Sequence, residues 1–534
     1  MKLSIASLKN KSAWEAANVV LPEYDVAAVA AKTHDEPVWV HFGAGNIFRG
    51  FIASLQQRLL NDGLSTSGII AADTFDYEII DKIFKPFDNL TLNVSLNPDG
   101  SSDYEVIGSV VEALKADSSD SGEMLRFSEI FTSPSLQMVS FTITEKGYAV
   151  KNTAGELLPI VVSDIENGPD SAKHAMSFVA ALLLKRYNAG KLPIAVVSMD
   201  NCSHNGEKLK SSILTVAKAW VEKGFAPVEF IDYLESDSVG FPWSMIDKIT
   251  PRPAKSVEDA LANAGVEDMA PIITSKNTYI APFVNAERPQ YLVVEDCFPN
   301  GRPPLEKAGV YLCDRDTVNK TERMKVTTCL NPLHTALAVY GCMLGYTLIC
   351  EEMKDAELVK LIKKLGYDEG LPVVTDPEII SPRAFIDEVV NERLPNPFMP
   401  DAPQRIATDT SQKVGIRFGE TIKSYAALQR ATELTAIPLA IAGWLRYLLG
   451  IDDNGELIEV SSDPLLGELQ AHLVGIELGK PESVGNKLRP ILENETIFGS
   501  DLSKVGLAEK IECYFKELIA GKGAVRATLK RHLD

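Results

Sequence analysis

The sequence predicts an α/β protein in which a sheet-containing N-terminal domain is followed by a mainly α-helical C-terminal domain. The chain has 534 residues, which is too long for one ordinary hydrophobic core. Short apolar segments alternate with helical patterns up to about residue 315, as expected for a parallel α/β sheet. Strand-like segments become scarce after that point, so we expect domains at residues 1–315 and 316–534.

The composition is that of a globular protein. Hydrophobic residues make up 45% and charged residues 24% of the chain. The net charge of −20 argues against nucleic acid and anionic membranes as partners. No run of about 18 uncharged apolar residues is present, and residues 1–20 lack the apolar block of a signal peptide. We therefore expect a cytoplasmic protein.

Cysteine and histidine residues give no sign of a metal site. The seven cysteines are odd in number and scattered, and none forms a CxxC pair. The seven histidines are also scattered and show no HxxxH spacing. The sequence therefore supports neither a disulfide framework nor a metal-assisted mechanism.

A glycine-rich turn, residues 43–50, follows the first predicted strand at residues 37–42. Apolar side chains then recur every four residues, as in a helix. Gly43 would allow a tight turn, and Gly45 would let the backbone approach a pyrophosphate at the helix N-terminus. The spacing is GxGxxxxG rather than GxGxxG, so a helix-capping turn of another α/β unit is the alternative.

Asp73 ends the second predicted strand, residues 68–72. An acidic residue at this place in a dinucleotide-binding unit usually holds a ribose 2′-hydroxyl group. No arginine or lysine lies between Asp73 and Asp81, which favours NAD over NADP, because a 2′-phosphate would need a cation. The alternative is that Asp73 is a turn or cap residue.

Two further candidates follow from later segments of the N-terminal half. Asn201 comes shortly after a predicted strand, where loops of open α/β sheets carry ligands, although an ordinary turn asparagine is the alternative. Asp247 lies among apolar residues and is either partly buried with a purpose or a cap. The other predicted strands are residues 90–96, 104–111, 137–144, 192–198 and 290–296, and a helix is predicted at 171–187.

The stretch at residues 325–346 combines a lysine, an asparagine and a histidine with a long apolar helix pattern. Asn331 before Pro332 predicts a helix N-cap and first helical residue, which puts His334 in the first turn. With Lys325 nearby, these groups could hold an alcohol that loses a proton; the alternative is a cap, a packed histidine and a solvated lysine. Further helices are predicted at residues 332–353, 355–365, 383–393, 419–430, 434–449, 463–476 and 505–521.

Six blocks, in order, resemble the polyol-specific long-chain dehydrogenases. They are HFGAGNIFRGF, SFTITEKGY, SMDNCSHNG, MIDKITP, QYLVVEDCFPNGRPPLE and the LNPLH core, and the similarity spans roughly residues 36–450. The resemblance implies an N-terminal Rossmann-type domain, a mainly helical C-terminal domain and an active site between them. It assigns cofactor binding to the first block, with Gly43, Ala44, Gly45, Asn46, Ile47 and Phe48.

The resemblance also implies metal-free hydride transfer to or from NAD with a lysine as acid/base. The family motif K-x4-N-x2-H falls on Lys325, Asn331 and His334, but one extra residue lies between the lysine and the asparagine. The remaining matches are Asn201, Glu322 as a proton exit, Asp247, and Arg393 and Lys413 as substrate-binding cations. The segment after Arg393 also departs from the family pattern, with Leu-Pro before Asn396.

The leading hypothesis is an NAD-dependent oxidoreductase that interconverts D-mannonate and D-fructuronate, a small-molecule substrate pair. Mannitol 2-dehydrogenase and tagaturonate reductase, which belong to the same family, are alternatives. A nicotinamide-binding sensor without catalysis is the alternative from another class, but it would not need an acid/base lysine. The sequence leaves open whether the protein is a monomer or a homodimer.

Overall fold

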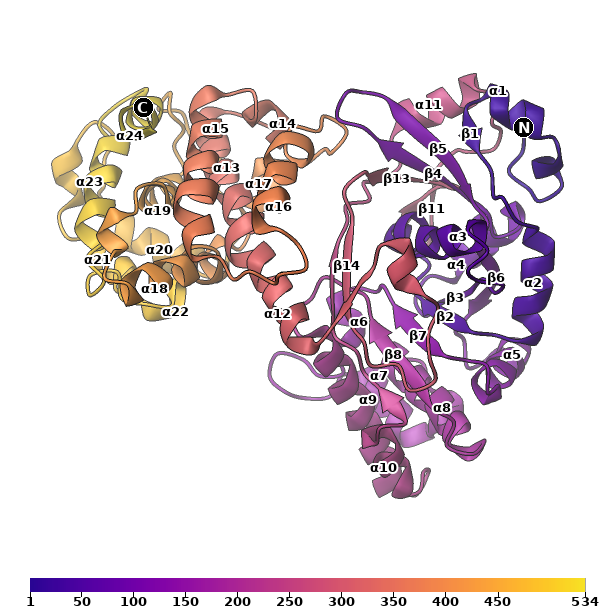
Figure 1. Cartoon of the computed structure of the whole chain (residues 1–534). Coiled ribbons are helices and arrows are strands. Elements are labelled where there is room, and N and C mark those ends of the chain that lie inside the picture. The colour runs from indigo at the N-terminus through magenta and orange to yellow at the C-terminus, as the bar shows by residue number, and fades with distance from the viewer. Residues whose placement is uncertain (534) are drawn as a thin grey trace. The chain divides into compact units, whose positions relative to one another are not determined.

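The computed structural model describes residues 1–533, which divide into two compact units (Figure 1). The first unit comprises Met1–Asn97 and Ser101–Asn319, and the second comprises Pro98–Gly100 with the residues from Lys320 onward. The division thus lies after Asn319, slightly beyond the position near 315 that the sequence suggests. None of the described helices is long and apolar enough to cross a membrane.

A six-stranded parallel sheet forms the centre of the first unit, with the strand order β6-β3-β2-β7-β8-β9. The chain passes from β2 outward to β3 and β6, and then returns to β7 on the other side of β2. This reversal makes the carboxyl end of β2 the topological switch point, where α/β sheets bind ligands. The strands are β2 (Trp39–Phe42), β3 (Ile69–Asp73), β6 (Val110–Lys115), β7 (Met138–Phe141), β8 (Ile194–Ser198) and β9 (Val239–Gly240).

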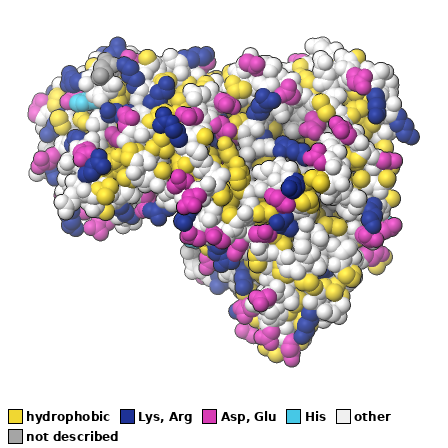
Figure 2. Space-filling model, viewed as in Figure 1, with side chains coloured by type: hydrophobic (Ala, Val, Ile, Leu, Met, Phe, Trp, Pro, Cys, Tyr) yellow, Lys and Arg dark blue, Asp and Glu magenta, His cyan; other side chains and the backbone are white. Residues whose placement is uncertain are grey.

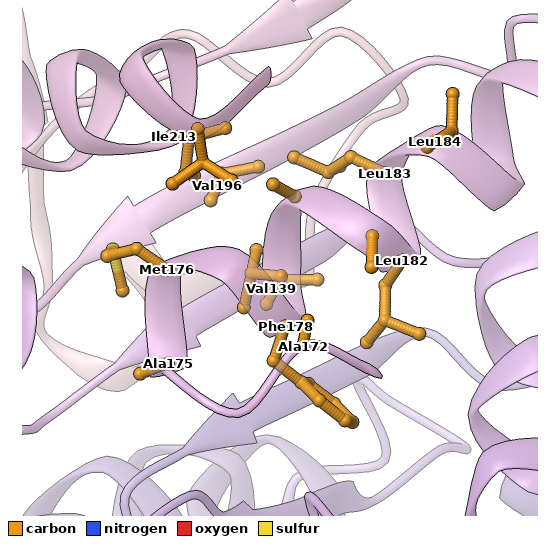
Figure 3. Packing of buried hydrophobic residues seen from close by; sticks show 14 of the residues in the cluster. Val139, Ala172, Ala175, Met176, Phe178, Leu182, Leu183, Leu184, Val196 and Ile213 are labelled. Carbon is orange, nitrogen blue, oxygen red and sulfur yellow. The ribbon is translucent and has the colours of Figure 1, made fainter. Parts of the chain in front are cut away.

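Two helices, α8 (Ala175–Asn188) and α9 (Asn205–Glu222), pack side by side against the sheet. Figure 3 shows Met176, Phe178 and neighbouring leucines of α8 beside Val139 of β7 and Val196 of β8. A helix that is apolar nearly all round is suited to such a buried position. The other helices of this unit are α1 (Lys11–Ala16), α2 (Val26–Asp35), α3 (Ala53–Asn61), α4 (Tyr77–Ile79), α5 (Ser121–Thr132), α6 (Glu145–Tyr148), α7 (Pro159–Asn167), α10 (Glu229–Glu235) and α11 (Lys255–Asn263).

Smaller sheets complete the first unit, and one of them corrects a sequence prediction. Residues 104–111 were expected to be one strand, but the chain leaves β5 at Ile107 and enters β6 at Val110. Gly108 lies at the break, where a side chain would press on Val26. The smaller strands are β1 (Val19–Val20), β4 (Thr91–Leu96), β5 (Ser102–Ile107), β10 (Ser244–Asp247), β11 (Ile272–Ile273), β12 (Tyr279–Ile280), β13 (Phe283–Glu287), β14 (Tyr291–Glu295) and β15 (Tyr311–Cys313).

The second unit is helical, and its core is built on α13 (Asn331–Leu344) and α19 (Ala436–Tyr447). Gly443 lets the Tyr340 ring approach closely, and the Tyr340 hydroxyl donates to the Leu439 carbonyl at 2.8 Å. The other helices after α11 are α12 (Arg315–Met324), α14 (Ile349–Glu352), α15 (Ala356–Lys363), α16 (Pro382–Glu388), α17 (Pro403–Ile406), α18 (Glu420–Ala427), α20 (Leu466–Leu473), α21 (Arg489–Leu492), α22 (Glu495–Phe498), α23 (Ala508–Leu518) and α24 (Ala524–Leu533).

The helix predicted at residues 332–353 is interrupted. Gly345 adopts a φ of 82°, which ends α13 with a left-handed residue, and α14 begins only at Ile349.

Acidic and basic side chains are interspersed over the face of the molecule drawn in Figure 2.

Six π-helical turns occur in residues 1–533, and three of them contain predicted site residues. These three are η2 (Phe48–Ile52), η7 (Lys325–Cys329) and η10 (Val389–Arg393), and a fourth, η12 (Gly415–Gly419), begins two residues after Lys413. A π turn accommodates one extra residue within an otherwise helical segment, often at functional sites. Turn η7 lies in the interval between Lys325 and Asn331, where the sequence has one residue more than the family motif.

Candidate active site

The glycine turn follows β2 at the switch point of the sheet and has the shape that a dinucleotide needs. Gly43 has a φ of 105°, and a Cβ there would overlap the Thr142 carbonyl of the neighbouring β7 segment. The Gly43 amide donates to the Ala72 carbonyl at 2.8 Å, which joins the turn to β3. A Cβ at Gly45, in contrast, would meet only open space. The first N–H groups of a helix have no partner within it, so the start of the helix after this turn is suited to a pyrophosphate.

Buried groups beneath the turn fix its shape. Phe48 is fully buried and stacks on His41 with 4.2 Å between the ring centroids, so it can offer a ligand only its backbone. Arg49 is also fully buried and donates to Asn46 Oδ1 and to the Ala281 carbonyl, each at 2.8 Å. Burial lowers the pKa of Arg49 to about 9. Among the predicted cofactor residues, Gly45, Asn46 and Ile47 retain surface exposure.

Asp73 links the end of β3 to the glycine turn. Its carboxylate accepts hydrogen bonds from the amides of Ala44 at 3.1 Å, Phe75 at 2.8 Å and Asp76 at 2.7 Å. Burial raises the pKa of Asp73, and these backbone donors oppose that rise. The turn role that the sequence left open is therefore present, and a carboxylate with four acceptor positions can also receive a ribose hydroxyl.

Asn201 lies in the loop after β8 and is exposed. The loop is anchored by two neighbours that the sequence did not single out. Asp200 accepts from the Ile143 amide at 2.8 Å and from the Tyr148 hydroxyl, and burial raises its pKa to about 7. Asn205 donates to the carbonyls of Asp200 and Ser244, each at 3.0 Å.

Asp247 is the last residue of β10 and is 6% exposed. Of the two possibilities that the sequence left open, the structure shows the buried one, since Asp247 ends a strand rather than capping a helix. Asn205 also accepts from the Ser244 amide at 3.0 Å. Because Ser244 opens β10, this bond ties the strand of Asp247 to the loop of Asn201.

In the second unit, Lys325 opens the π turn η7 and is 3% exposed, so it is not the solvated side chain of the alternative interpretation. Glu322 lies one turn earlier in α12 and is half-buried. The Leu330 amide donates to the Lys325 carbonyl at 3.1 Å, and the His334 amide donates to the Leu330 carbonyl at 3.1 Å. These two bonds connect η7 to α13 across Leu330, whose backbone is not helical, with φ −129° and ψ −62°.

The prediction that Asn331 caps α13 is wrong. The cap position belongs to Leu330, no side chain caps this end, and Asn331 is already the first helical residue. A capping side chain requires an extended residue before the helix. Here the π turn keeps the chain helical up to Leu330, so the asparagine side chain is not used as a cap. His334 lies in the first turn, as predicted.

His334 has a charged partner that the sequence did not reveal. Its Nε2 atom lies 3.0 Å from Asp401 Oδ2, and Asp401 also pairs with Arg405. Burial raises the pKa of Asp401, but His334 and Arg405 together lower it below its usual value. The only sequence signal was the four-residue spacing of Asp401 and Arg405, which is common on exposed helices.

The two predicted substrate-binding cations are not surface charges. Arg393 ends the π turn η10 and is 5% exposed, and Lys413 is half-buried with its Nζ on the Thr408 carbonyl. Helix α13 packs against α17 and η12, and both α16 and η12 pack against η7. These contacts bring together, in the second unit, the elements that carry Lys325, His334 and Arg405, and turn η12, which begins two residues after Lys413.

Comparison with known proteins shows the family to which this architecture belongs. Residues 38–307 match the mannitol dehydrogenase Rossmann domain, and residues 317–519 match the mannitol dehydrogenase C-terminal domain. The chain belongs to the mannitol dehydrogenase family. As a member of this family it is an oxidoreductase, and the two matched segments correspond to the sheet-containing and helical units described above.

Several relatives match this mannitol dehydrogenase family member over nearly its whole length. It is 54% identical to D-mannonate oxidoreductase of Thermotoga maritima, over 99% of this chain and 98% of the relative. A crystal structure of substrate-free D-sorbitol dehydrogenase is 27% identical, with a TM-score of 0.79 and coverage of 96% and 97%. Pseudomonas fluorescens mannitol 2-dehydrogenase, in ternary complex with NAD and D-mannitol, is 27% identical, with a TM-score of 0.70 and coverage of 99% for both chains.

Proposed function

We propose that this enzyme is an NAD-dependent oxidoreductase that interconverts D-mannonate and D-fructuronate. The observation that carries the proposal is the 54% identity to a D-mannonate oxidoreductase over 99% of the chain. The half-buried cations Lys413 and Arg417, of which Arg417 donates to Thr335 next to His334, support a substrate that bears a carboxylate.

The residues around the switch point fit NAD. The open space at Gly45 and the unpaired amides of the helix that follows would accept the pyrophosphate, and Asp73 would accept the adenosine ribose hydroxyl. Bound NAD supplies the hydride acceptor for alcohol oxidation and, as NADH, the hydride donor for the reverse reaction.

The polar residues of the two units have complementary roles in this reaction. Lys325 Nζ would accept the proton from the alcohol in oxidation and return it to the oxygen in reduction. Asn331 and Asn201 would donate hydrogen bonds to the oxygen as it becomes negative. His334, whose Nε2 lies close to Asp401, would orient a substrate hydroxyl, and Glu322 would pass the proton on to solvent. Asp247 would bind a further hydroxyl group.

A substrate panel tests the proposal. The change in NADH absorbance is followed with D-fructuronate, D-tagaturonate and D-fructose, and in the reverse direction with D-mannonate and D-mannitol. We expect D-fructuronate to have the highest kcat/KM of the three ketoses. Preference for D-fructose or D-tagaturonate would identify one of the alternative family activities, and the absence of turnover with every substrate would favour a sensor.

The cofactor preference provides a second prediction. The parent enzyme should strongly prefer NADH to NADPH, because Asp73 repels a 2′-phosphate. Asp73→Ala should raise the KM for NADH by about tenfold or more, equivalent to about 1.4 kcal/mol. The same change should reduce the preference for NADH over NADPH. Steady-state kinetics with both cofactors measure the effect, and Asp81→Ala, at an exposed position, is the matched control. Equal kcat/KM for both cofactors in the parent would remove Asp73 from this role.

A further inference from the structure

Arg417 is an arginine without a carboxylate partner. It lies in the π turn η12, is only partly exposed, and its Nη1 donates to Thr335 Oγ1. Within residues 1–533 no aspartate or glutamate pairs with its guanidinium, and burial lowers its pKa to about 10. A guanidinium has five N–H donors. Among the described residues, the Arg417 side chain donates to only one acceptor group, the Thr335 hydroxyl.

Four other arginines that are buried or half-buried use their donors in different ways. Arg186 uses its donors on five backbone carbonyls. Arg446 donates to three carbonyls, those of Leu518, Ile451 and Asp452. Arg526 and Arg489 pair with carboxylates. Arg417 has neither the carbonyl cage nor the carboxylate, so most of its donors remain available for an acceptor that is not part of the chain.

A second cation stands beside it. Burial first, and then the positive charges of Arg417 and Arg405, lower the pKa of Lys413, while Asp409 and Asp463 act in the opposite direction. Two like charges this close repel each other in a partly buried site, and an anion placed between them would relieve the repulsion. The pair therefore has the chemistry of a carboxylate-binding site.

The position of Arg417 connects this site to the predicted catalytic groups. Thr335, which accepts from Arg417, follows His334 directly and donates to the Asn331 carbonyl at 2.9 Å. Turn η12 also packs against η7, the turn that begins with Lys325. The guanidinium is thus bonded to the turn of α13 that carries Asn331 and His334, and its own turn adjoins that of the lysine.

We propose that Arg417, assisted by Lys413, binds the carboxylate of the sugar-acid substrate and sets the preference of the enzyme for sugar acids over polyols. D-Fructuronate and D-fructose share the reacting ketone and differ at the far end of the carbon chain, where one has a carboxylate and the other a hydroxymethyl group. A planar guanidinium can bind a carboxylate with two parallel hydrogen bonds, whereas a hydroxymethyl group offers no charge to pair. Arg417 thereby takes the role that the sequence suggested for Arg393.

The test compares both ketoses on three variants. Arg417→Met removes the charge at similar volume, Arg417→Lys keeps the charge without the fork, and Arg430→Met is the matched control, since Arg430 is exposed and pairs with Glu433. We expect Arg417→Met to lower kcat/KM for D-fructuronate on the order of 100-fold and to change that for D-fructose by less than about threefold. The kcat/KM of Arg417→Lys for D-fructuronate should lie between those of the parent and Arg417→Met. The kcat/KM of Arg430→Met should match that of the parent.

The inference rests on the proposed function, and a binding measurement separates the two. Calorimetric titration with D-mannonate is performed on the parent and on Arg417→Met, with thermal melting to confirm that the variant is folded. If the parent does not bind D-mannonate, the proposed function itself fails. If the parent binds it and Arg417→Met binds it equally well, only the role of Arg417 is overturned.

Two kinetic outcomes would also overturn it. Equal losses on both ketoses would indicate that Arg417 only supports the fold of the first turn of α13. If Arg393→Met lost the preference for D-fructuronate over D-fructose while Arg417→Met kept it, Arg393 rather than Arg417 would be the residue that binds the carboxylate. If Arg417→Met does not fold, Arg417→Lys provides the same comparison, because a retained parent ratio in that variant would contradict the need for the guanidinium fork.

Discussion

Replacing Lys325 with methionine should lower kcat by about a thousandfold while leaving NADH affinity nearly unchanged. The lysine is 3% exposed and opens η7, close in sequence to Asn331 and His334. Methionine preserves much of the volume, which keeps the packing of the turn. The loss is then confined to proton transfer, an interaction made in the transition state, and kcat and kcat/KM for the ketose should fall together.

Steady-state kinetics and NADH fluorescence titration measure the two quantities. Lys354→Met is the matched control, because Lys354 is an exposed lysine of the same unit that pairs with Glu351. Turnover near the parent level in the Lys325 variant would show that another group acts as the acid/base, and Lys413 would be the next residue to test.

The second large effect concerns stability rather than catalysis, and it comes from Glu352 in α14. This side chain is fully buried, and neither carboxyl oxygen has a hydrogen-bond partner within the described chain. Burial first, and then the charges of Asp355 and Asp401, raise its pKa to about 9. The carboxyl fits only because Gly341 of α13 has no side chain, since a Cβ there would overlap it.

A carboxyl group whose pKa rises on folding stabilises the protein while it is protonated in both states. That contribution is fully present below the usual pKa of 4.5 and is lost progressively as the pH rises toward about 9. Glu352→Gln keeps the shape and cannot ionise. The variant should therefore match the parent near pH 5 and exceed it at pH 9, by on the order of 3 kcal/mol or more in unfolding free energy.

Urea unfolding of both proteins at pH 5, 7 and 9 measures this difference. Glu351→Gln, at the exposed neighbouring position, should leave the pH dependence of the parent unchanged. A constant difference between Glu352→Gln and parent across the three pH values would mean that Glu352 has an ordinary pKa in the folded protein.

The sequence predicted the parts of the site that depend on local pattern. The strand, the glycine turn and Asp73 belong to one short βαβ segment, whose hydrophobic spacing and turn residues are visible in order along the chain. The helix that carries His334 was equally visible from its apolar run and from Asn331-Pro332. Each of these features can be recognised from residues that are close together in the sequence.

The missed features depend on residues that meet only after folding. Asp401 reaches His334, and Arg417 reaches Thr335, across long separations in sequence, and no spacing rule connects them. The cap at Asn331 was mispredicted because a π turn has no sequence signature of its own. The break at Gly108 was missed because β5 and β6 belong to different sheets, which a continuous apolar segment does not reveal.

The π turn η7 has a consequence for how this family evolves. An extra residue in a regular helix rotates everything after it by about 100°, because a turn holds about 3.6 residues. A π turn such as η7 can absorb an extra residue as a local bulge, which limits the rotation of the chain that follows. A π turn can therefore accommodate a single-codon insertion between the lysine and the asparagine, and a search for a fixed four-residue interval would pass over chains, such as this one, that carry the insertion.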